Sequence, residues 1–144
     1  MSISGQDIDQ DLIKKYEEMR FEKKPQGMIL KIDSENLILE KHTTDSFEEM
    51  VSLLPEAEPR YVLYDFPMKN RVGLDDTRML FLFWMPMESP VRLRMQYAGA
   101  KSLINTKFNG ISVQIQEDEK SSLTMERIKS KMAARQGANY QQIG

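Results

Sequence analysis

Hydrophobic residues recur at helical spacing in the segment from Glu88 to Lys101, and they do so on two sides. At about 100° per residue, one stripe has the spacing that buries a helix against a core. This first stripe consists of Leu93, Tyr97, Ala100 and Ile104. A narrower second stripe lies on the opposite side. It consists of Val91, Met95 and Ala98 and is bordered by Arg92, Arg94 and Lys101.

A surface helix needs only one apolar side, so the second stripe requires an explanation of its own. An apolar strip with an arginine rim can lose its water against the groove of a partner protein, while the rim charges fix the register. The alternative is that a sheet covers one side of the helix and a loop of the same chain covers the other. Periodicity by itself leaves both interpretations open.

The rest of the chain alternates between helical and strand patterns. Helical periodicity covers residues 7–20 and 124–134, and Ser46 with Glu49 forms a capping-box pattern that begins a short helix over 46–54. Strand patterns cover residues 28–32, 36–40, 61–66, 79–84 and 111–116.

Two of these strand segments, 61–66 and 79–84, are apolar enough to be central and adjacent strands. The polar residues 67–78 between them predict an exposed loop or a hairpin extension. The order of elements predicts an α/β (α+β) fold in a single domain, with a central mixed sheet flanked by helices on both faces.

Composition narrows the class of protein. The 144 residues suit one domain, and the absence of cysteine excludes disulfides, thiol catalysis and cysteine-ligated zinc. No apolar run approaches the roughly 20 residues of a membrane span, and the first residues lack a signal-peptide pattern, so we expect a cytosolic protein that is not an integral membrane protein. The net charge of −2 provides no overall field for nucleic acid, and we expect no nucleic-acid partner.

Catalytic chemistry is not indicated. The single histidine, His42, lies beside Lys41, with no Ser-His-Asp arrangement, glycine-rich phosphate loop or metal-ligand spacing. We therefore expect a surface histidine, no enzymatic activity, no cofactor and no metal. A cation site built from Asp65, Asp75 and Asp76 is an alternative, but neighbouring basic residues favour an ordinary solvated loop.

Five short motifs together suggest a family. They are Ser4-Gly5, Tyr61 to Phe66, Phe83 to Pro86, Ser89 to Ala98 followed by Lys101, and Asn109 to Ile111. With these motifs the chain resembles the actin-depolymerising factor/cofilin family, and the motif of the long helix is the most specific. The resemblance implies an ADF-homology domain over residues 1–135, followed by a polar, flexible tail over 136–144.

The resemblance implies a monomeric actin-binding protein of the cytoplasm and actin cytoskeleton. Members bind actin monomers and filaments, prefer ADP-bound subunits, and promote filament severing and depolymerisation. The surface that serves both monomer and filament binding corresponds here to Ser4, Gly5, Val91, Arg92, Arg94, Met95 and Lys101. Its helix positions include the second stripe and the rim, which helical geometry selects independently.

A second family surface contacts a neighbouring subunit of the filament. It corresponds here to Lys69, Arg71, Arg78, Lys131 and Arg135. Asp76 and Ala134 stand where relatives often carry further basic residues. Because an exposed charge pair contributes roughly 0 to 1 kcal/mol, we expect filament binding to persist with lower affinity.

A further departure is Gly99, where relatives commonly have serine. Glycine inside a helix costs about 1 kcal/mol relative to alanine, which suggests a kink or a close backbone approach. A similar Tyr-Ala-Gly occurs in the glia maturation factor branch, whose members debranch actin networks by binding the actin-branching complex. That function is the alternative, but Arg92 and Arg94 favour the cofilin branch.

Two regulatory expectations also follow from the resemblance. Ser4 corresponds to the inhibitory phosphorylation site, where a phosphate would add roughly −1.5 to −2 charges to a segment that lies against actin. Phosphoinositide headgroups could compete with actin for a basic strip. That strip consists of Arg92, Arg94, Lys101 and Lys107.

Overall fold

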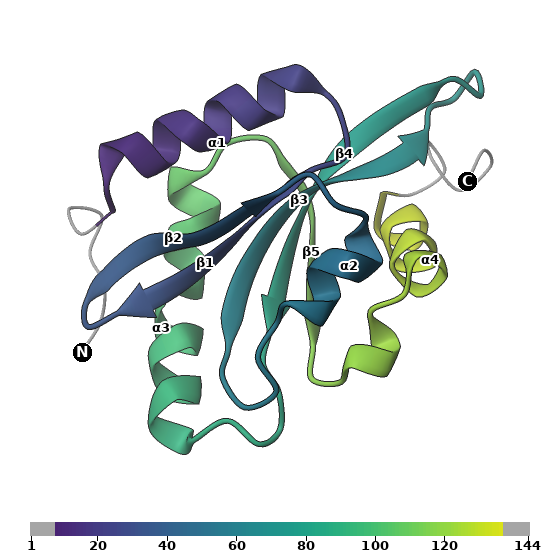
Figure 1. Ribbon diagram of the computed structural model, residues 1–144. Helices are drawn as coiled ribbons and strands as arrows, with labels where there is room; N and C mark the ends of the chain where they lie inside the picture. The colour runs from purple at the N-terminus through teal and green to yellow at the C-terminus, as the bar shows by residue number, and fades with distance from the viewer. Residues whose placement is uncertain (1–7, 137–144) are drawn as a thin grey trace.

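A five-stranded mixed sheet forms the centre of the structure, a computed structural model that describes residues 8–136 (Figure 1). The strands are β1 (Gly27–Asp33), β2 (Asn36–Thr43), β3 (Arg60–Lys69), β4 (Asp75–Trp84) and β5 (Ile111–Glu117). Their order in the sheet is β2-β1-β3-β4-β5. Neighbouring strands are antiparallel except β4 and β5, which are parallel and therefore need a long crossover connection.

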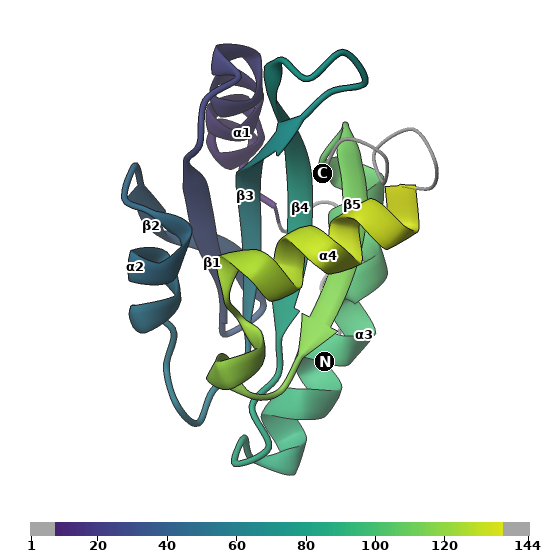
Figure 2. The same ribbon diagram turned by 90° about the vertical axis from the view of Figure 1, so that its right-hand side faces the viewer.

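Helices cover both faces of the sheet. They are α1 (Gln10–Glu22), α2 (Phe47–Ser52), α3 (Val91–Lys107) and α4 (Met125–Gln136), with a short 3₁₀ turn, η2 (Lys120–Ser122). The crossover helix α3 lies with α1 on one face, and α2 lies with α4 on the other (Figures 1 and 2). This arrangement confirms the predicted fold class.

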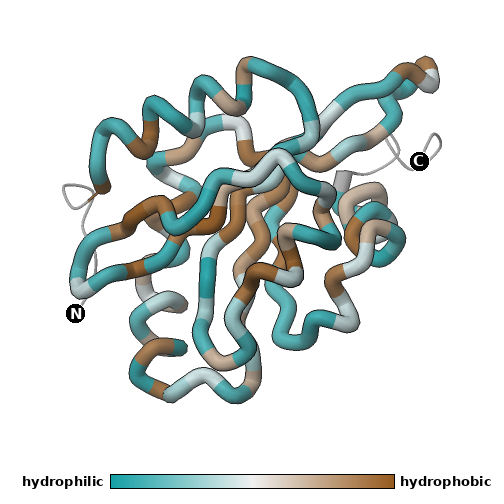
Figure 3. Tube along the Cα trace, in the orientation of Figure 1, coloured by the Kyte–Doolittle hydropathy of each residue, from teal (hydrophilic) through white to brown (hydrophobic). Residues whose placement is uncertain are grey.

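Each face of the sheet has its own hydrophobic core because side chains alternate along a strand. On β3, Tyr61 and Leu63 pack toward α1 and α3, whereas Val62 and Phe66 pack toward α2 and α4. Both faces are therefore buried, and β3 and β4 are nearly continuous in apolar residues. Figure 3 shows the hydrophobic positions concentrated in these central strands, with a further group at the tip of the β3–β4 hairpin.

The predicted polar segment 67–78 is largely a hairpin extension. Strands β3 and β4 stay paired from Arg60 opposite Trp84 to Lys69 opposite Asp75, so only residues 70–74 turn the chain. We call residues 67–78 the hairpin arm, which projects beyond the rest of the sheet in Figure 1. The side-chain oxygen of Asn70 accepts backbone N–H groups from Val72 and Leu74, each at 3.0 Å, which fixes the turn.

Helix α2 begins with the predicted capping interaction. The Ser46 hydroxyl oxygen accepts the backbone N–H of Glu49 at 3.2 Å, which satisfies one of the donors at the start of the helix. The long helix α3 begins differently, after Pro90, without a side-chain cap. Proline fits at a helix start because it has no N–H to satisfy there.

The close backbone approach predicted at Gly99 is wrong. Helix α3 runs without interruption from Val91 to Lys107, and a Cβ atom added to Gly99 would meet nothing within 4 Å. Gly99 faces solvent, so no neighbouring backbone requires the absence of a side chain. The residue weakens helix propensity without serving a close contact.

Candidate functional site

The second stripe of α3 is exposed on the surface. Val91 is 68% exposed, Met95 is 70% exposed, and Ala98 also faces solvent, so no loop of residues 8–136 covers them. These three residues are called the exposed stripe. Apolar side chains that stay in water cost free energy in the isolated protein and gain it on burial against a partner. The structure thus confirms the predicted exposure and rules out the alternative of a covering loop within the described chain.

The first stripe holds α3 in this orientation. Tyr97, Ala100 and Ile104 are buried in the core below α1 and α3, and Leu93 is half-buried beside them. The Tyr97 hydroxyl accepts the backbone N–H of Ile32 at 2.9 Å. Its ring lies 5.2 Å from that of Tyr61, whose hydroxyl donates to the Tyr97 carbonyl. These contacts fix the rotation of the helix about its axis, so the exposed stripe is presented rigidly.

The three charged residues that border the exposed stripe differ in exposure and in their contacts. Arg92 and Arg94 are exposed, and neither forms an ion pair with another residue of the described range 8–136. Lys101 is half-buried, and its Nζ lies 5.8 Å from the ring centroid of Phe83, a cation–π contact that draws the side chain toward the sheet. The two arginines are therefore the available charged groups beside the exposed stripe.

The N-terminal part of the predicted surface, Ser4 and Gly5, lies outside the described residues. The first residue described, Ile8, bridges Leu37 of β2. The amide of Gln96 donates to the Ser34 carbonyl at 2.9 Å, which ties α3 to the turn between β1 and β2. This bond adds to the tyrosine contacts that fix α3.

The second predicted surface combines the hairpin arm with α4, and its cations are largely engaged within the molecule. Lys69 pairs with Asp75, and the Arg78 guanidinium pairs with Asp76 at 2.8 Å. On α4, Lys131 pairs with Glu117 of β5, and Arg135 donates to the Gln114 carbonyl. Arg71 is exposed near the tip of the arm. Asp76, noted from sequence as a departure, thus neutralises the arginine two residues away.

Sequence reasoning missed the apolar character of the arm's tip. Val72 is 75% exposed and Leu74 is also exposed, on either side of Gly73, which has a positive φ of 82°. The signal was present in the sequence as two aliphatic residues within a polar segment. The sequence predicted that this segment is exposed, but the two aliphatic residues were not included in the candidate surface.

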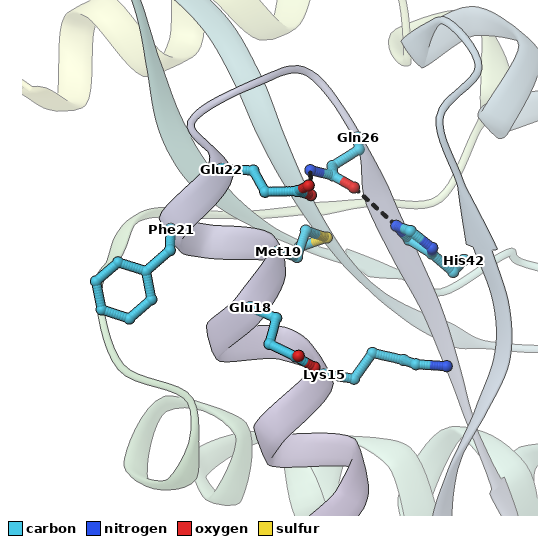
Figure 4. A pocket seen from close by; sticks show the side chains of 7 residues that line it. All are labelled: Lys15, Glu18, Met19, Phe21, Glu22, Gln26 and His42. Atoms are coloured by element: carbon cyan, nitrogen blue, oxygen red, sulfur yellow. Dashed lines mark hydrogen bonds between the residues drawn. The ribbon is translucent and has the colours of Figure 1, made fainter.

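His42 takes part in a series of side-chain hydrogen bonds that connects β2 with α1. A hollow of about 500 Å³ lies between α1 and β2, and Figure 4 shows His42 on its wall with Gln26 and Glu22. The Nε2 atom of His42 lies 2.8 Å from the Gln26 side-chain oxygen, and the Gln26 amide donates to Glu22 at 2.7 Å. Among the residues that line the hollow there is no serine, cysteine or threonine to act as a nucleophile.

Residues 8–136 contain neither a metal-binding cluster nor a helix that could span a membrane. Within residues 8–136, no group of three or more His, Asp or Glu side chains could hold a metal ion. The suggested cation site is contradicted: Asp65 is buried, while Asp75 and Asp76 are each paired with a cation. No helix of the same range combines the length and apolar character that a membrane crossing requires.

Comparisons with known proteins identify the family and agree with the fold. The family model of cofilin/tropomyosin-type actin-binding protein matches residues 5–133. The cofilin of Yarrowia lipolytica is 30% identical over 143 residues, covering 96% of this chain and 94% of the relative. A crystal structure of Streptomyces griseoflavus cofilin has a TM-score of 0.81 at 22% identity, covering 88% of this chain and 96% of that one.

The family match and the fold identify an ADF-homology domain. The chain belongs to the family of cofilin/tropomyosin-type actin-binding proteins. A neighbouring branch is also similar: the solution structure of glia maturation factor from Caenorhabditis elegans has a TM-score of 0.76 at 26% identity, covering 91% of this chain and 98% of that one.

Proposed function

We propose that this protein binds actin monomers and filaments and promotes filament severing and depolymerisation, acting as a monomer at the cytoplasmic actin cytoskeleton. One observation carries the proposal: a rigidly held helix presents the exposed stripe of Val91, Met95 and Ala98 between two arginines that have no ion-pair partner within residues 8–136. Burial of this stripe supplies the affinity, and the arginines set the register against the actin groove.

The shared surface for monomers and filaments consists of Ser4, Gly5, Val91, Arg92, Arg94, Met95 and Lys101. Of these, Val91 and Met95 are the apolar anchors, and Arg92 and Arg94 are the polar ones. Lys101 contributes less because its ammonium group already contacts the Phe83 ring. We propose that the functional domain extends to about residue 135.

The filament-specific surface consists of Lys69, Arg71, Arg78, Lys131 and Arg135. Several of these cations already have acidic or carbonyl partners within the chain. Filament contact must exchange or share those pairs, so each contributes little net free energy. The exposed tip residues Val72 and Leu74 are therefore proposed to supply the apolar part of this contact.

Two inhibitory inputs are proposed at the shared surface. Phosphorylation of Ser4 would place negative charge against actin and lower binding. Phosphoinositide headgroups would compete with actin mainly for Arg92 and Arg94, which are exposed, and less for Lys101 and Lys107, which are half-buried.

The decisive variant is R92A/R94A, tested against the matched control K14A/K15A on the exposed side of α1. We expect the arginine variant to lose most monomer and filament binding, by about a hundredfold if both residues are anchors, with an unchanged melting temperature. The control should bind like the unmodified protein. Co-sedimentation with filaments and a monomer-binding titration measure both outcomes. Equal binding by all three proteins would contradict the proposal.

A glia maturation factor-like debranching activity is the second candidate, because that branch shares the fold and the Tyr97-Ala98-Gly99 sequence. Imaging of single filaments and of branched networks separates the two functions. We expect unbranched filaments to be severed and branch junctions not to be lost preferentially. Selective loss of branches with intact unbranched filaments would favour the second candidate.

A further inference from the structure

The hairpin arm carries charged residues on both of its faces, and Arg78 and Asp76 share one of them. Residues directly opposite each other on two antiparallel strands lie on the same face of the sheet. Arg78 is opposite Phe66 and Asp76 is opposite Met68. Phe66 and Met68 belong to the core that α2 and α4 cover. Arg78 and Asp76 therefore lie on the α4 side of the arm.

Lys69 and Asp75 lie on the other face of the arm. They are opposite each other in the register, and Lys69 is separated by even numbers of residues from Tyr61 and Leu63, which pack toward α1 and α3. Both members of this ion pair are exposed. The chain thus has two adjacent aspartates on one strand, of which only Asp76 lies on the α4 side.

A second ion pair lies on the same side of the sheet as Arg78 and Asp76. Glu117 of β5 is opposite Trp84, which belongs to the core that α2 and α4 cover. Glu117 is buried and pairs with Lys131 of α4, which is half-buried. The face that the arm shares with α4 therefore carries two cations, Arg78 and Lys131, each beside one carboxylate.

The pair on the arm needs little additional ordering to form. The Arg78 Nη1 atom lies 2.8 Å from Asp76 Oδ2, and both side chains are half-buried. Residues two positions apart on a strand point to the same side, so the backbone already places the two groups together. A partner that approaches this face meets a neutral pair. A cation whose charge is already matched gains less from an acidic group of the partner than an unmatched cation would.

We propose that Asp76 limits the filament affinity of this protein by holding the Arg78 guanidinium in an intramolecular ion pair, and that Glu117 limits it in the same way through Lys131. This role rests on the proposed function, filament binding. The four charges cancel, so the contact depends mainly on the exposed apolar tip of the arm, Val72 and Leu74.

The proposal distinguishes filament binding from monomer binding. Removing either carboxylate should strengthen the contact with filaments, because its cation is then matched by an acidic group of the neighbouring subunit. Monomer binding should not change, since the exposed stripe belongs to α3, which lies on the opposite face of the sheet from α4 (Figure 2).

The test compares D76N with the matched control D75N by co-sedimentation with filaments. Both variants remove one negative charge from the same strand, and asparagine keeps the oxygen that accepts the Thr77 backbone N–H at 2.8 Å. We expect D76N to bind filaments about threefold more tightly at low salt, and the gain to shrink at about 200 mM salt because screening weakens the new contact. D75N should bind like the unmodified protein, because Lys69 lies on the other face.

Two further variants test the route of the effect. The gain should disappear in D76N/R78Q, since it acts through the arginine, and E117Q should give a gain similar to that of D76N. Unchanged filament binding by D76N, an equal gain in D75N, or a gain that persists in D76N/R78Q would overturn the role of Asp76. The comparison of D76N with D75N remains decisive if the double variant or E117Q does not fold.

A monomer-binding titration separates this role from the proposed function. If the unmodified protein binds monomers and filaments but D76N shows no gain, only the role of Asp76 is wrong. If the unmodified protein does not sediment with filaments, both filament binding and the role of Asp76 are wrong. A gain of D76N in monomer binding equal to that in filament binding would also contradict the assignment of Arg78 to the filament contact.

Discussion

Met95 and Tyr97 are two positions apart on α3 and have opposite surroundings. Met95 is exposed, while Tyr97 is buried and hydrogen-bonded to the backbone of β1. Each step along a helix rotates the side-chain direction by about 100°, so side chains two positions apart point about 200° apart. The contrast therefore follows from helical geometry once one of the two sides is buried. The exposed side of α3 carries Met95, which belongs to the proposed actin contact.

Asp65 is a buried carboxyl group whose ionisation affects stability. Burial raises the pKa of Asp65 to about 6, although the Thr77 side chain and the positive charge of Lys23 each lower it. The unfolded chain loses this proton near pH 4. The folded state therefore holds the proton more strongly, and the free energy of unfolding falls as the pH rises from about 4 to about 6. Above that range the cost stays constant.

The corresponding prediction compares Asp65→Asn with the unmodified protein by urea denaturation at several pH values. At about pH 4 the two proteins should have similar stability, and the variant should gain up to about 3 kcal/mol relative to the unmodified chain by pH 7. Asp118→Asn, at an exposed position, is the control and should show no such gain. A constant difference between the two proteins across this pH range would contradict the buried, proton-retaining carboxyl.

At the scale of elements, α3 and the hairpin arm show two different determinants of structure. Helix α3 depends on a long apolar stripe packed on the sheet, which compensates for a glycine in its middle. The arm depends on continued strand pairing and on the Asn70 side chain, which accepts two backbone N–H groups in the turn. In both elements, contacts within the chain therefore hold the exposed residues in place.

The glycine in α3 gives an element-scale prediction. Gly99→Ala should stabilise the protein by about 0.5–1 kcal/mol, because alanine favours the helix and its Cβ meets no atom within 4 Å. Gly110→Ala is the contrasting variant and should be destabilising, since Gly110 has a φ of 81° and its Cβ would contact Arg20. Thermal unfolding measures both changes, and a destabilised Gly99→Ala protein would indicate a hidden close contact.

At the scale of the whole molecule, the two proposed actin surfaces are far apart. The beginning of α3 and the tip of the hairpin arm lie at opposite ends of the molecule in both Figure 1 and Figure 2. On the proposed function, one molecule of this protein would contact two neighbouring actin subunits of a filament through the two surfaces, whereas an actin monomer would contact the shared surface alone. This separation predicts that the two binding activities can be altered independently.

The variant V72S/L74S tests that independence. Both side chains are exposed, so folding stability should stay within about 0.5 kcal/mol of the unmodified protein. Filament binding should weaken by about tenfold, while monomer binding stays unchanged. V91S/M95S on the exposed stripe is the comparison and should weaken both activities. If the tip variant lost monomer binding as well, the division into two surfaces would be wrong.

The sequence by itself determined most of the local structure. Periodicity identified the helices, the central strands and both stripes of α3, because a helix rotates each residue by a fixed angle and a strand alternates its side chains. The long-helix motif also indicated the family. Strands β3 and β4 extend further into residues 67–78 than predicted, because polar residues on a projecting hairpin lack the apolar pattern of a core strand.

Only the tertiary structure decided which charged residues are available and which are occupied. Arg92 and Arg94 are adjacent to the exposed stripe and have no ion-pair partner within residues 8–136, whereas Lys131 and Arg135 are engaged by groups on β5. Likewise, Asp65 and Thr77 line a cavity together with residues from the end of α1 and from the turn into β5, which are distant in the chain. Contacts between residues distant in the chain depend on how elements pack, and periodicity along one segment contains no information about them.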